Sequence, residues 1–104
     1  MSGRRSRDKG ARTERHFVRL LQAAGFAAEK CSRTGYSGHD ISLPLLNRDL
    51  AVECKARSEF ATLYRWLASA DLLVLKADRQ EPLIVVPLRL AIEIATAAER
   101  ASSA

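Results

Sequence analysis

Hydrophobic residues in the first third of the chain recur at the spacing of a helix. Between residues 17 and 24, apolar side chains fall every three or four positions, so they line one helical face. Thr13 can act as an N-cap, and Gly25 is a typical residue at a helix end. The pattern predicts a helix that begins at Thr13 and stops before Gly25. Glu14 then lies in the first turn, on the flank of the apolar face that meets the rest of the domain.

The rest of the chain alternates between short apolar runs and turn-forming residues. Apolar runs of strand length predict strands, and an apolar period of three to four residues predicts helices. The strands are expected at residues 26–31, 40–45, 50–56, 72–76 and 83–86, and the helices at 60–67 and 88–100. Asn47-Arg48-Asp49 is the predicted hairpin turn, and Pro44 is expected near a sheet edge. The order helix, three strands, helix, two strands, helix predicts a mixed α/β fold.

Length and composition fit one small domain. The chain has 104 residues, of which 47% are hydrophobic, and its apolar runs are only a few residues long. No membrane span or secretory signal is therefore expected, and the protein is predicted to be soluble and cytoplasmic. Cys31 and Cys54 lack the density and spacing of a disulfide framework or a zinc site, so both are predicted to be reduced core residues.

Basic residues are concentrated at the start of the chain. The net charge is +5, and five basic residues against one Asp place +4 of it in the first 12 residues. Residues 1–12 lack an apolar period, which predicts a flexible basic arm ahead of a single domain over residues 13–104. Such an arm attracts nucleic-acid phosphates without reading bases, and the alternative is a solubilising tail. The candidate DNA-binding residues of the arm are Arg4, Arg5, Arg7, Lys9 and Arg12.

Acidic residues on adjacent predicted strands form the candidate chemical site. Asp40 begins one strand, and Glu53-Cys54-Lys55 lies in the next. Two carboxylates and a backbone carbonyl make an oxygen site suited to Mg²⁺ or Mn²⁺. Lys55 shares a strand face with Glu53 and can orient a water or stabilise phosphate charge, and Glu14 can supply a third carboxylate. The alternative is an ordinary exposed charge face at Glu53 and Lys55, with Glu14 only a first-turn helix charge.

These residues resemble the motif of the PD-(D/E)XK nuclease superfamily, and most closely that of the archaeal-type and phage Holliday junction resolvases. The likeness covers residues 10–87 and is carried by Gly-Ala-Arg-Thr-Glu, Ser-Gly-His-Asp-Ile and Ala-Val-Glu-Cys-Lys. It implies a restriction-endonuclease-like α/β fold, which is a small mixed β-sheet flanked by helices, and metal-dependent hydrolysis of DNA phosphodiester bonds. His39 stands where the family usually has a proline, which shapes the start of the strand and is not itself a ligand.

The resemblance also implies a role for each site residue. Asp40 and Glu53 would hold Mg²⁺ or Mn²⁺ together with the backbone carbonyl of Cys54, and Glu14 would join them directly or through water. Lys55 would position the attacking water. Catalysis would thus depend on Glu14, Asp40, Glu53 and Lys55.

The expected partner is branched DNA. Further DNA contacts are expected in the glycine-rich loop and just after the site, at Arg33, Tyr36, Ser37 and Arg57. A four-way junction needs two opposing nicks, so a homodimer with twofold symmetry is expected. The alternatives are a superfamily nuclease acting on other DNA, in restriction, repair or replication, and a non-catalytic DNA-binding module.

Overall fold

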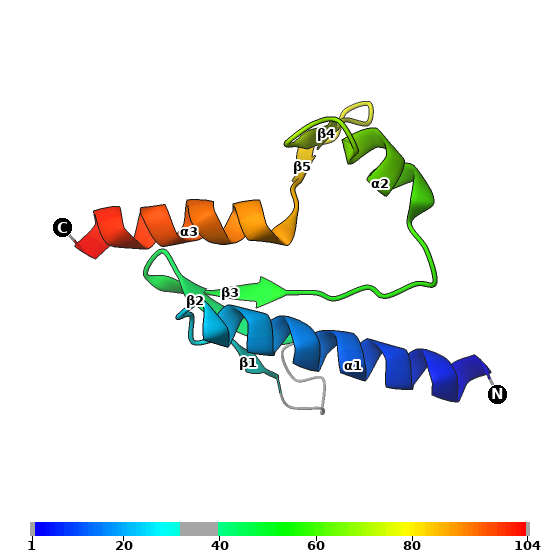
Figure 1. Cartoon of the computed structure of the whole chain (residues 1–104), viewed down its shortest axis with the longest axis horizontal. Coiled ribbons are helices and arrows are strands. Elements are labelled where there is room, and N and C mark those ends of the chain that lie inside the picture. The colour runs from blue at the N-terminus through cyan, green and yellow to red at the C-terminus, as the bar shows by residue number, and fades with distance from the viewer. Residues whose placement is uncertain (1, 32–39, 104) are drawn as a thin grey trace. The chain divides into compact units, whose positions relative to one another are not determined.

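The structure is a computed structural model that describes residues 2–31 and 40–103, with side chains described for residues 9–31 and 40–102. Within these residues, three helices and five strands follow the predicted order (Figure 1). The elements are α1 (Ser2–Ala23), β1 (Glu29–Lys30), β2 (Ile41–Leu45), β3 (Arg48–Val52), α2 (Ala61–Leu67), β4 (Leu73–Leu75), β5 (Leu83–Val85) and α3 (Leu88–Ser103). The predicted mixed α/β class is confirmed.

The strands form two separate antiparallel sheets. One is three-stranded with the order β1-β2-β3, and the other is the two-stranded pair β4-β5. All pairings among the described strands join consecutive strands through short connections, which allow antiparallel pairing, whereas parallel pairing needs a longer crossover. The restriction-endonuclease-like arrangement expected from the resemblance stays a prediction.

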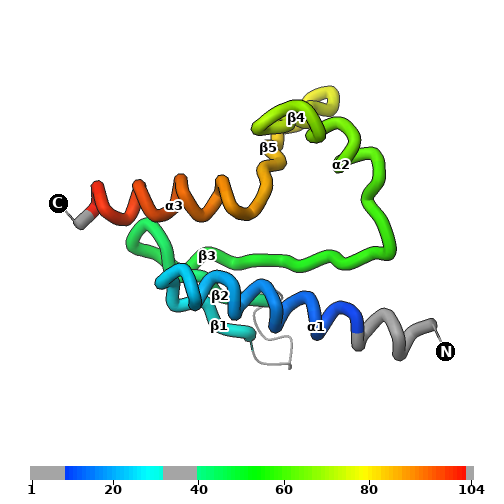
Figure 2. The backbone as a smooth tube through the Cα atoms, in the orientation of Figure 1, coloured from blue at the N-terminus to red at the C-terminus, as the bar shows by residue number. Residues whose placement is uncertain are grey.

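The chain divides into two compact units (Figure 2). Unit 1 comprises residues 1–56 and 98–104, and it contains α1 and the three-stranded sheet. Unit 2 comprises residues 57–97, and it contains α2 and the β4-β5 hairpin. The single domain predicted over residues 13–104 stays a prediction.

α1 begins eleven residues earlier than the sequence predicts. It starts at Ser2 instead of Thr13, so the residues expected to form an arm without regular structure are helical from Ser2 onward. Extending an existing helix costs far less than nucleating one, and Arg, Lys and Ala are good helix formers. The amphipathic helix of residues 13–23 can therefore extend toward the N-terminus through residues 2–12, although these residues have no apolar period of their own.

The predicted stop at Gly25 is confirmed. Gly25 has a φ of 99°, a conformation that costs glycine nothing. Its N–H donates to the Gln22 carbonyl at 3.0 Å, and the Phe26 N–H donates to the Leu21 carbonyl at 3.0 Å. These two bonds form a Schellman motif, which satisfies the last carbonyls of α1 and turns the chain toward β1.

The β2-β3 hairpin turns one residue earlier than predicted. Leu45 pairs with Arg48, so the turn consists of Leu46 and Asn47, with φ values of 59° and 62°. Two consecutive residues with positive φ make the tight type I′ turn, whose twist matches that of antiparallel strands. Arg48 and Asp49, expected in the turn, therefore belong to β3. Pro44 lies beyond the residues that β1 pairs, in agreement with its predicted place near an edge.

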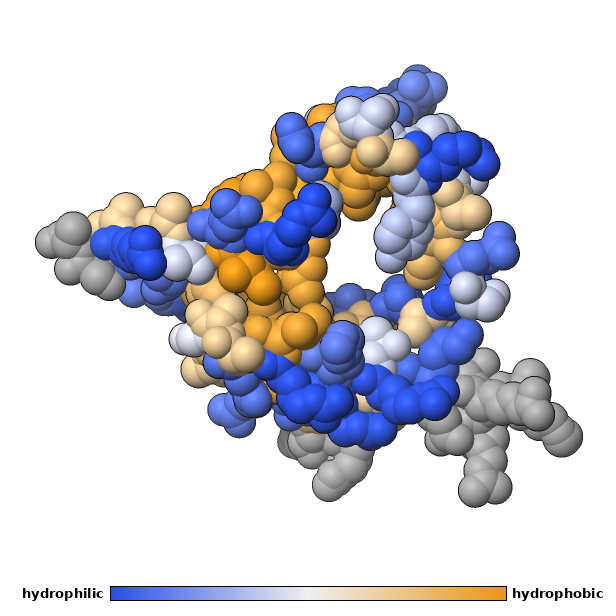
Figure 3. Space-filling view, in the orientation of Figure 1, coloured by the Kyte–Doolittle hydropathy of each residue, from blue (hydrophilic) through white to orange (hydrophobic). Residues whose placement is uncertain are grey.

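Unit 1 contains the buried core. Val18 and Leu21 of α1 are buried together with Ala28 and with Ile41 of β2. α1 therefore packs one apolar stripe on the sheet, as the helical period predicts. Unit 2 contains no buried residue, and its apolar side chains reach the surface over β4 and β5 (Figure 3). Within residues 2–31 and 40–103, no helix is both long enough and apolar enough to cross a membrane.

Candidate functional site

Asp40 is held by its backbone between the ends of two strands. Its carbonyl accepts a hydrogen bond from the Cys31 N–H at 2.9 Å, just after β1. Its own N–H donates to the carbonyl of Val52, the last residue of β3, at 3.1 Å. Both neighbouring strands therefore fix the position of Asp40 immediately before β2.

The Asp40 side chain ties the predicted Glu-x-Lys segment to the sheet. The Cys54 N–H donates to Asp40 Oδ2 at 2.7 Å, a length typical of charge-assisted bonds. β3 was predicted to extend to residue 56, but it ends at Val52. Two residues beyond the end of β3, the Cys54 N–H thus bonds to a side-chain carboxylate and not to a backbone carbonyl. Continuing the Ile41–Val52 register by one residue places Asp40 opposite Glu53.

Glu53 and Lys55 lie on the same side of the segment, as their alternation predicts. Lys55 Nζ is 3.2 Å from Glu53 Oε2, and the Lys55 side chain is 72% exposed. An exposed ion pair of this kind contributes little to stability, because water competes for both charges. Lys55 can therefore leave Glu53 for another anion at small cost.

Glu14 projects from α1 toward the sheet. Its Oε1 is 3.5 Å from Lys30 Nζ, and its side chain is only 17% exposed. Lys30 pairs with Ile41, the residue that follows Asp40. The ion pair thus brings the carboxylate of α1 to the part of the sheet that carries Asp40.

The Cys54 thiol experiences the negative charge of all three carboxylates. Burial raises the pKa of this thiol above its ordinary value, and the negative charges of Asp40, Glu14 and Glu53 raise it further. Asp40 and Glu53 come from one hairpin and Glu14 from a helix, so three distant parts of the sequence contribute to one negative region. All three carboxylates that the sequence singled out thus act on one thiol.

The donor set suits a hard divalent cation. Carboxylate oxygens and the Cys54 carbonyl are the ligands that Mg²⁺ and Mn²⁺ prefer, and a cation would offset the repulsion among three like charges. Among the described residues, however, no three acidic, Cys or His side chains gather closely enough to hold a metal ion. Glu14 and Glu53 are instead paired with Lys30 and Lys55. Metal binding would require these two ion pairs to open.

The predicted DNA-binding residues are more widely distributed along the chain than the predicted metal ligands. Arg12 is exposed on α1, Lys9 is half-buried there, and Arg57 is exposed just after the site. Arg4, Arg5 and Arg7 belong to α1, but their side chains lie outside the described residues, and so do Arg33, Tyr36, Ser37 and His39. The predicted cysteine state agrees in part, since Cys31 and Cys54 are free thiols but only half-buried.

Sequence reasoning missed Lys30. Its ammonium neutralises Glu14, and so it controls whether that carboxylate is available to a ligand. The signal was its place in the predicted strand just before the glycine-rich loop, since a basic residue there pairs with the strand that follows Asp40. The contact with Glu14 depends on how the helix packs, which the sequence pattern does not specify.

No protein-family model, curated protein or solved structure matches this chain. The class of the protein therefore rests on the residues of the site and their arrangement.

Proposed function

We propose that this chain is a metal-dependent endodeoxyribonuclease of the PD-(D/E)XK type, with a restriction-endonuclease-like fold and a four-way DNA junction as its preferred substrate. One observation carries the proposal: the Cys54 N–H bond to Asp40 Oδ2 couples Asp40 to the Glu53-Cys54-Lys55 segment. The raised pKa of the Cys54 thiol supports the proposal. Besides burial, the negative charges of Asp40, Glu14 and Glu53 cause this shift, and these are the three carboxylates that the proposed metal site needs.

Asp40 and Glu53 would hold Mg²⁺ or Mn²⁺ with the Cys54 carbonyl, and Glu14 would join directly or through water. When bound, the cation lowers the pKa of water and neutralises charge on a phosphate. The backbone bonds of Asp40 keep its carboxylate in place without a ligand. Lys30 keeps Glu14 neutralised until a second cation competes for it.

Lys55 is the chain's own cation at the site. Its ammonium is largely exposed and pairs only weakly with Glu53, so it is free to turn toward a phosphate oxygen or a water beside it. There it would orient the attacking water and stabilise the negative charge that develops on the phosphate. Lys30, the other lysine near the site, is instead paired with Glu14.

One cleavage experiment tests both the junction preference and the metal dependence. In Mg²⁺, the chain should cut a four-way junction at least about tenfold faster than linear or flapped DNA of the same sequence, and EDTA should stop cleavage of all three. Gel analysis of end-labelled strands measures the rates. Equal rates on the three substrates would contradict the junction assignment and favour a superfamily nuclease with another role. Cleavage that persists in EDTA would contradict the metal dependence.

A second candidate function is a non-catalytic DNA-binding module. The two lysine–carboxylate ion pairs favour it, because they satisfy Glu14 and Glu53 without any metal. Mn²⁺ titration monitored by calorimetry separates the candidates. Saturable Mn²⁺ binding that Asp40→Asn weakens supports the nuclease, and DNA binding with no Mn²⁺ binding supports the module.

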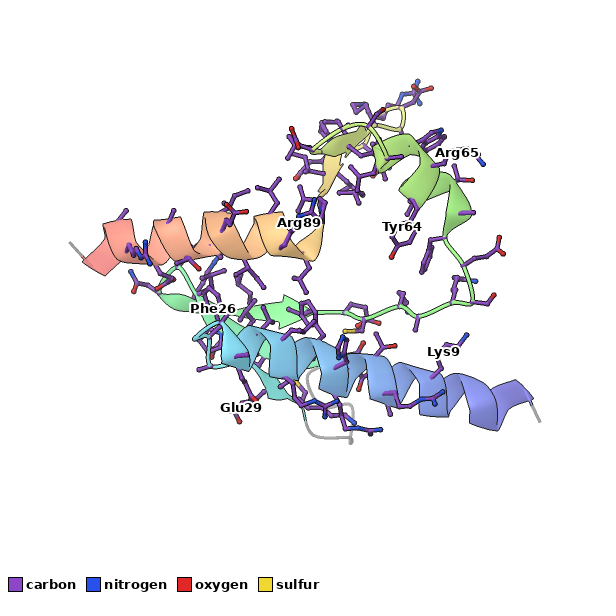
Figure 4. The ribbon with its side chains drawn as sticks, in the orientation of Figure 1. Lys9, Phe26, Glu29, Tyr64, Arg65 and Arg89 are labelled. Atoms are coloured by element: carbon purple, nitrogen blue, oxygen red, sulfur yellow. The ribbon has the colours of Figure 1, made fainter. Side chains whose placement is uncertain are left out.

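We also propose that the chain forms a homodimer through unit 2. Its β4-β5 sheet has two free edges and exposed apolar side chains, among them Ile84 at 63% and Leu83 at 62%. Trp66 and Tyr64 of α2 are exposed as well, and Tyr64 projects outward from α2 (Figure 4). A two-stranded hairpin is marginal in water by itself. A twofold axis perpendicular to an edge strand would pair identical strands antiparallel and make a four-stranded sheet.

The oligomeric state tests this interface. Light scattering at micromolar concentration should give twice the mass of one chain, and Ile84→Asp should shift it toward one chain, because a buried unpaired carboxylate opposes association. Leu46→Asp is the matched control, since Leu46 is also an exposed apolar residue but belongs to unit 1. A wild-type protein with the mass of one chain would rule out the homodimer.

A further inference from the structure

One side of α1 carries a stripe of four basic residues, with no acidic residue on that side between residues 9 and 19. Lys9, Arg12, Arg15 and Arg19 follow one another at steps of three, three and four, so they share a helical face about 120° wide. At about 1.5 Å per residue, the stripe is about 15 Å long. The three arginines are exposed and Lys9 is half-buried, and Lys9 projects outward from α1 (Figure 4). These four residues are the basic ridge.

The other side of α1 holds the helix in place. Val18 and Leu21 are buried there, and Glu14 forms its ion pair with Lys30 of β1. The helix therefore docks on the sheet through a face that excludes the basic ridge. The ridge belongs to a packed element and keeps its spacing without a ligand, in contrast to the flexible arm that the sequence predicts.

The basic ridge carries four positive charges within eleven residues of α1. No described side chain forms an ion pair with any of its four residues. Like charges three or four residues apart on a helix repel one another, and a bound polyanion would relieve this repulsion. The arrangement suits a ligand with closely spaced negative charges.

We infer that the basic ridge binds the phosphate backbone of duplex DNA at a surface separate from the carboxylate site. DNA is taken as the ligand from the proposed function, but binding at the ridge needs neither metal nor cleavage. Duplex DNA carries about one negative charge per 1.7 Å of its axis, so a ridge about 15 Å long can meet several phosphates. Point charges on long, exposed side chains contact the backbone without reading bases.

The composition of α1 favours DNA over an anionic membrane. A helix that lies in a membrane surface buries an apolar face among the lipids. The apolar face of α1 already packs on the sheet through Val18 and Leu21. The ridge itself offers only charge, which suits a phosphate backbone.

The ridge and the carboxylate site lie on different sides of α1, so DNA binding at the ridge is separate from cleavage at the site. Glu14 faces the sheet, whereas Arg12 and Arg15 face solvent. The ridge would hold one duplex arm, while the carboxylate site acts on another part of the same molecule. Weakening the ridge should therefore reduce affinity and leave the cleavage rate of the saturated complex unchanged.

Two triple variants of the full chain test the inference. The ridge variant combines Arg12→Gln, Arg15→Gln and Arg19→Gln, which keep helix propensity, and the control variant combines Arg48→Gln, Arg79→Gln and Arg100→Gln. Each removes three exposed positive charges from a net charge of +5. Affinity for a labelled duplex is measured by fluorescence anisotropy in EDTA, between about 50 and 200 mM salt.

The salt dependence of affinity separates the outcomes. The slope of log affinity against log salt should become shallower by about 2 to 3 in the ridge variant and remain near the wild-type slope in the control variant. Equal changes in both variants would overturn the inference, because net charge alone would then explain binding. So would an unchanged DNA slope together with lost binding to phosphatidylserine vesicles, which would assign the ridge to membranes. The binding measurement is made in EDTA, so it does not depend on cleavage. A protein that binds DNA through the ridge but does not cut it would contradict only the proposed function.

Discussion

Asp40→Asn and Lys55→Ala are each expected to slow DNA cleavage by about 10²–10⁴-fold while leaving affinity for DNA in EDTA nearly unchanged. Asn keeps an oxygen that can accept from the Cys54 N–H, so Asp40→Asn removes the charge and preserves the anchoring bond. Lys55→Ala removes the only cation paired at this segment, and the exposed Lys55 side chain makes no packing contribution that folding requires. Single-turnover cleavage of a saturated junction measures the effect on chemistry.

Matched replacements elsewhere control for lost charge. Asp49→Asn removes an exposed carboxylate from the same hairpin, and Lys76→Ala removes an exposed lysine. Both should cleave within about twofold of wild type, since exposed charges away from the site have small effects. If Asp40→Asn or Lys55→Ala cleaves as fast as these controls, then the carboxylate cluster is not catalytic. Asp40→Ala should in addition lower the free energy of unfolding by about 1–3 kcal/mol more than Asp40→Asn, because the Cys54 N–H then loses its acceptor.

Ile41→Ala is expected to lower the free energy of unfolding by about 2–4 kcal/mol. Ile41 is 0% exposed and lies in the central strand of the three-stranded sheet, paired with Lys30 on one side and Val52 on the other. Truncation removes buried methyl groups and leaves a cavity beneath α1 that the surrounding residues cannot fully close. Urea unfolding followed by far-ultraviolet circular dichroism measures the loss.

Ile84→Ala is the matched control for Ile41→Ala. Ile84 has the same side chain in a strand of unit 2, but it is 63% exposed, so its truncation should cost less than about 1 kcal/mol in a monomeric sample. Equal losses for the two variants would contradict the assignment of the core to unit 1. Ile41→Val should fall between them, at about 0.5–1.5 kcal/mol.

Elements with a clear local signal were predicted well. The helical period and Gly25 placed the end of α1, because glycine accommodates the positive φ that a Schellman motif needs. Short apolar runs placed all five strands in the right order. The acidic candidates were also recognisable. Asp40 and the Glu53-Cys54-Lys55 segment flank one predicted hairpin, and Glu14 lies beside the apolar face of the first predicted helix.

Boundaries and contacts were predicted less well because they depend on competing partners. The start of α1 depends on the low cost of helix extension, which leaves no mark in the apolar pattern of residues 2–12. The hairpin turned at Leu46, a residue with no turn preference, because the register of the apolar strand faces outweighed turn chemistry. β3 ends at Val52, and two residues later the Cys54 N–H bonds to the Asp40 side chain, a contact that the alternation of residues 50–56 does not reveal.

The sequence by itself determined the α/β class, the order of the elements and the identity of the candidate chemical residues, because periodicity, turn formers and residue type are local properties of the chain. Only the tertiary structure decided that Glu14, Asp40 and Glu53 share the surroundings of the Cys54 thiol, and that Lys30 neutralises Glu14. The same is true of the basic ridge, which exists because α1 continues to Ser2 and docks by its opposite face. Strand register and helix packing set these distances, and both depend on residues far apart along the chain.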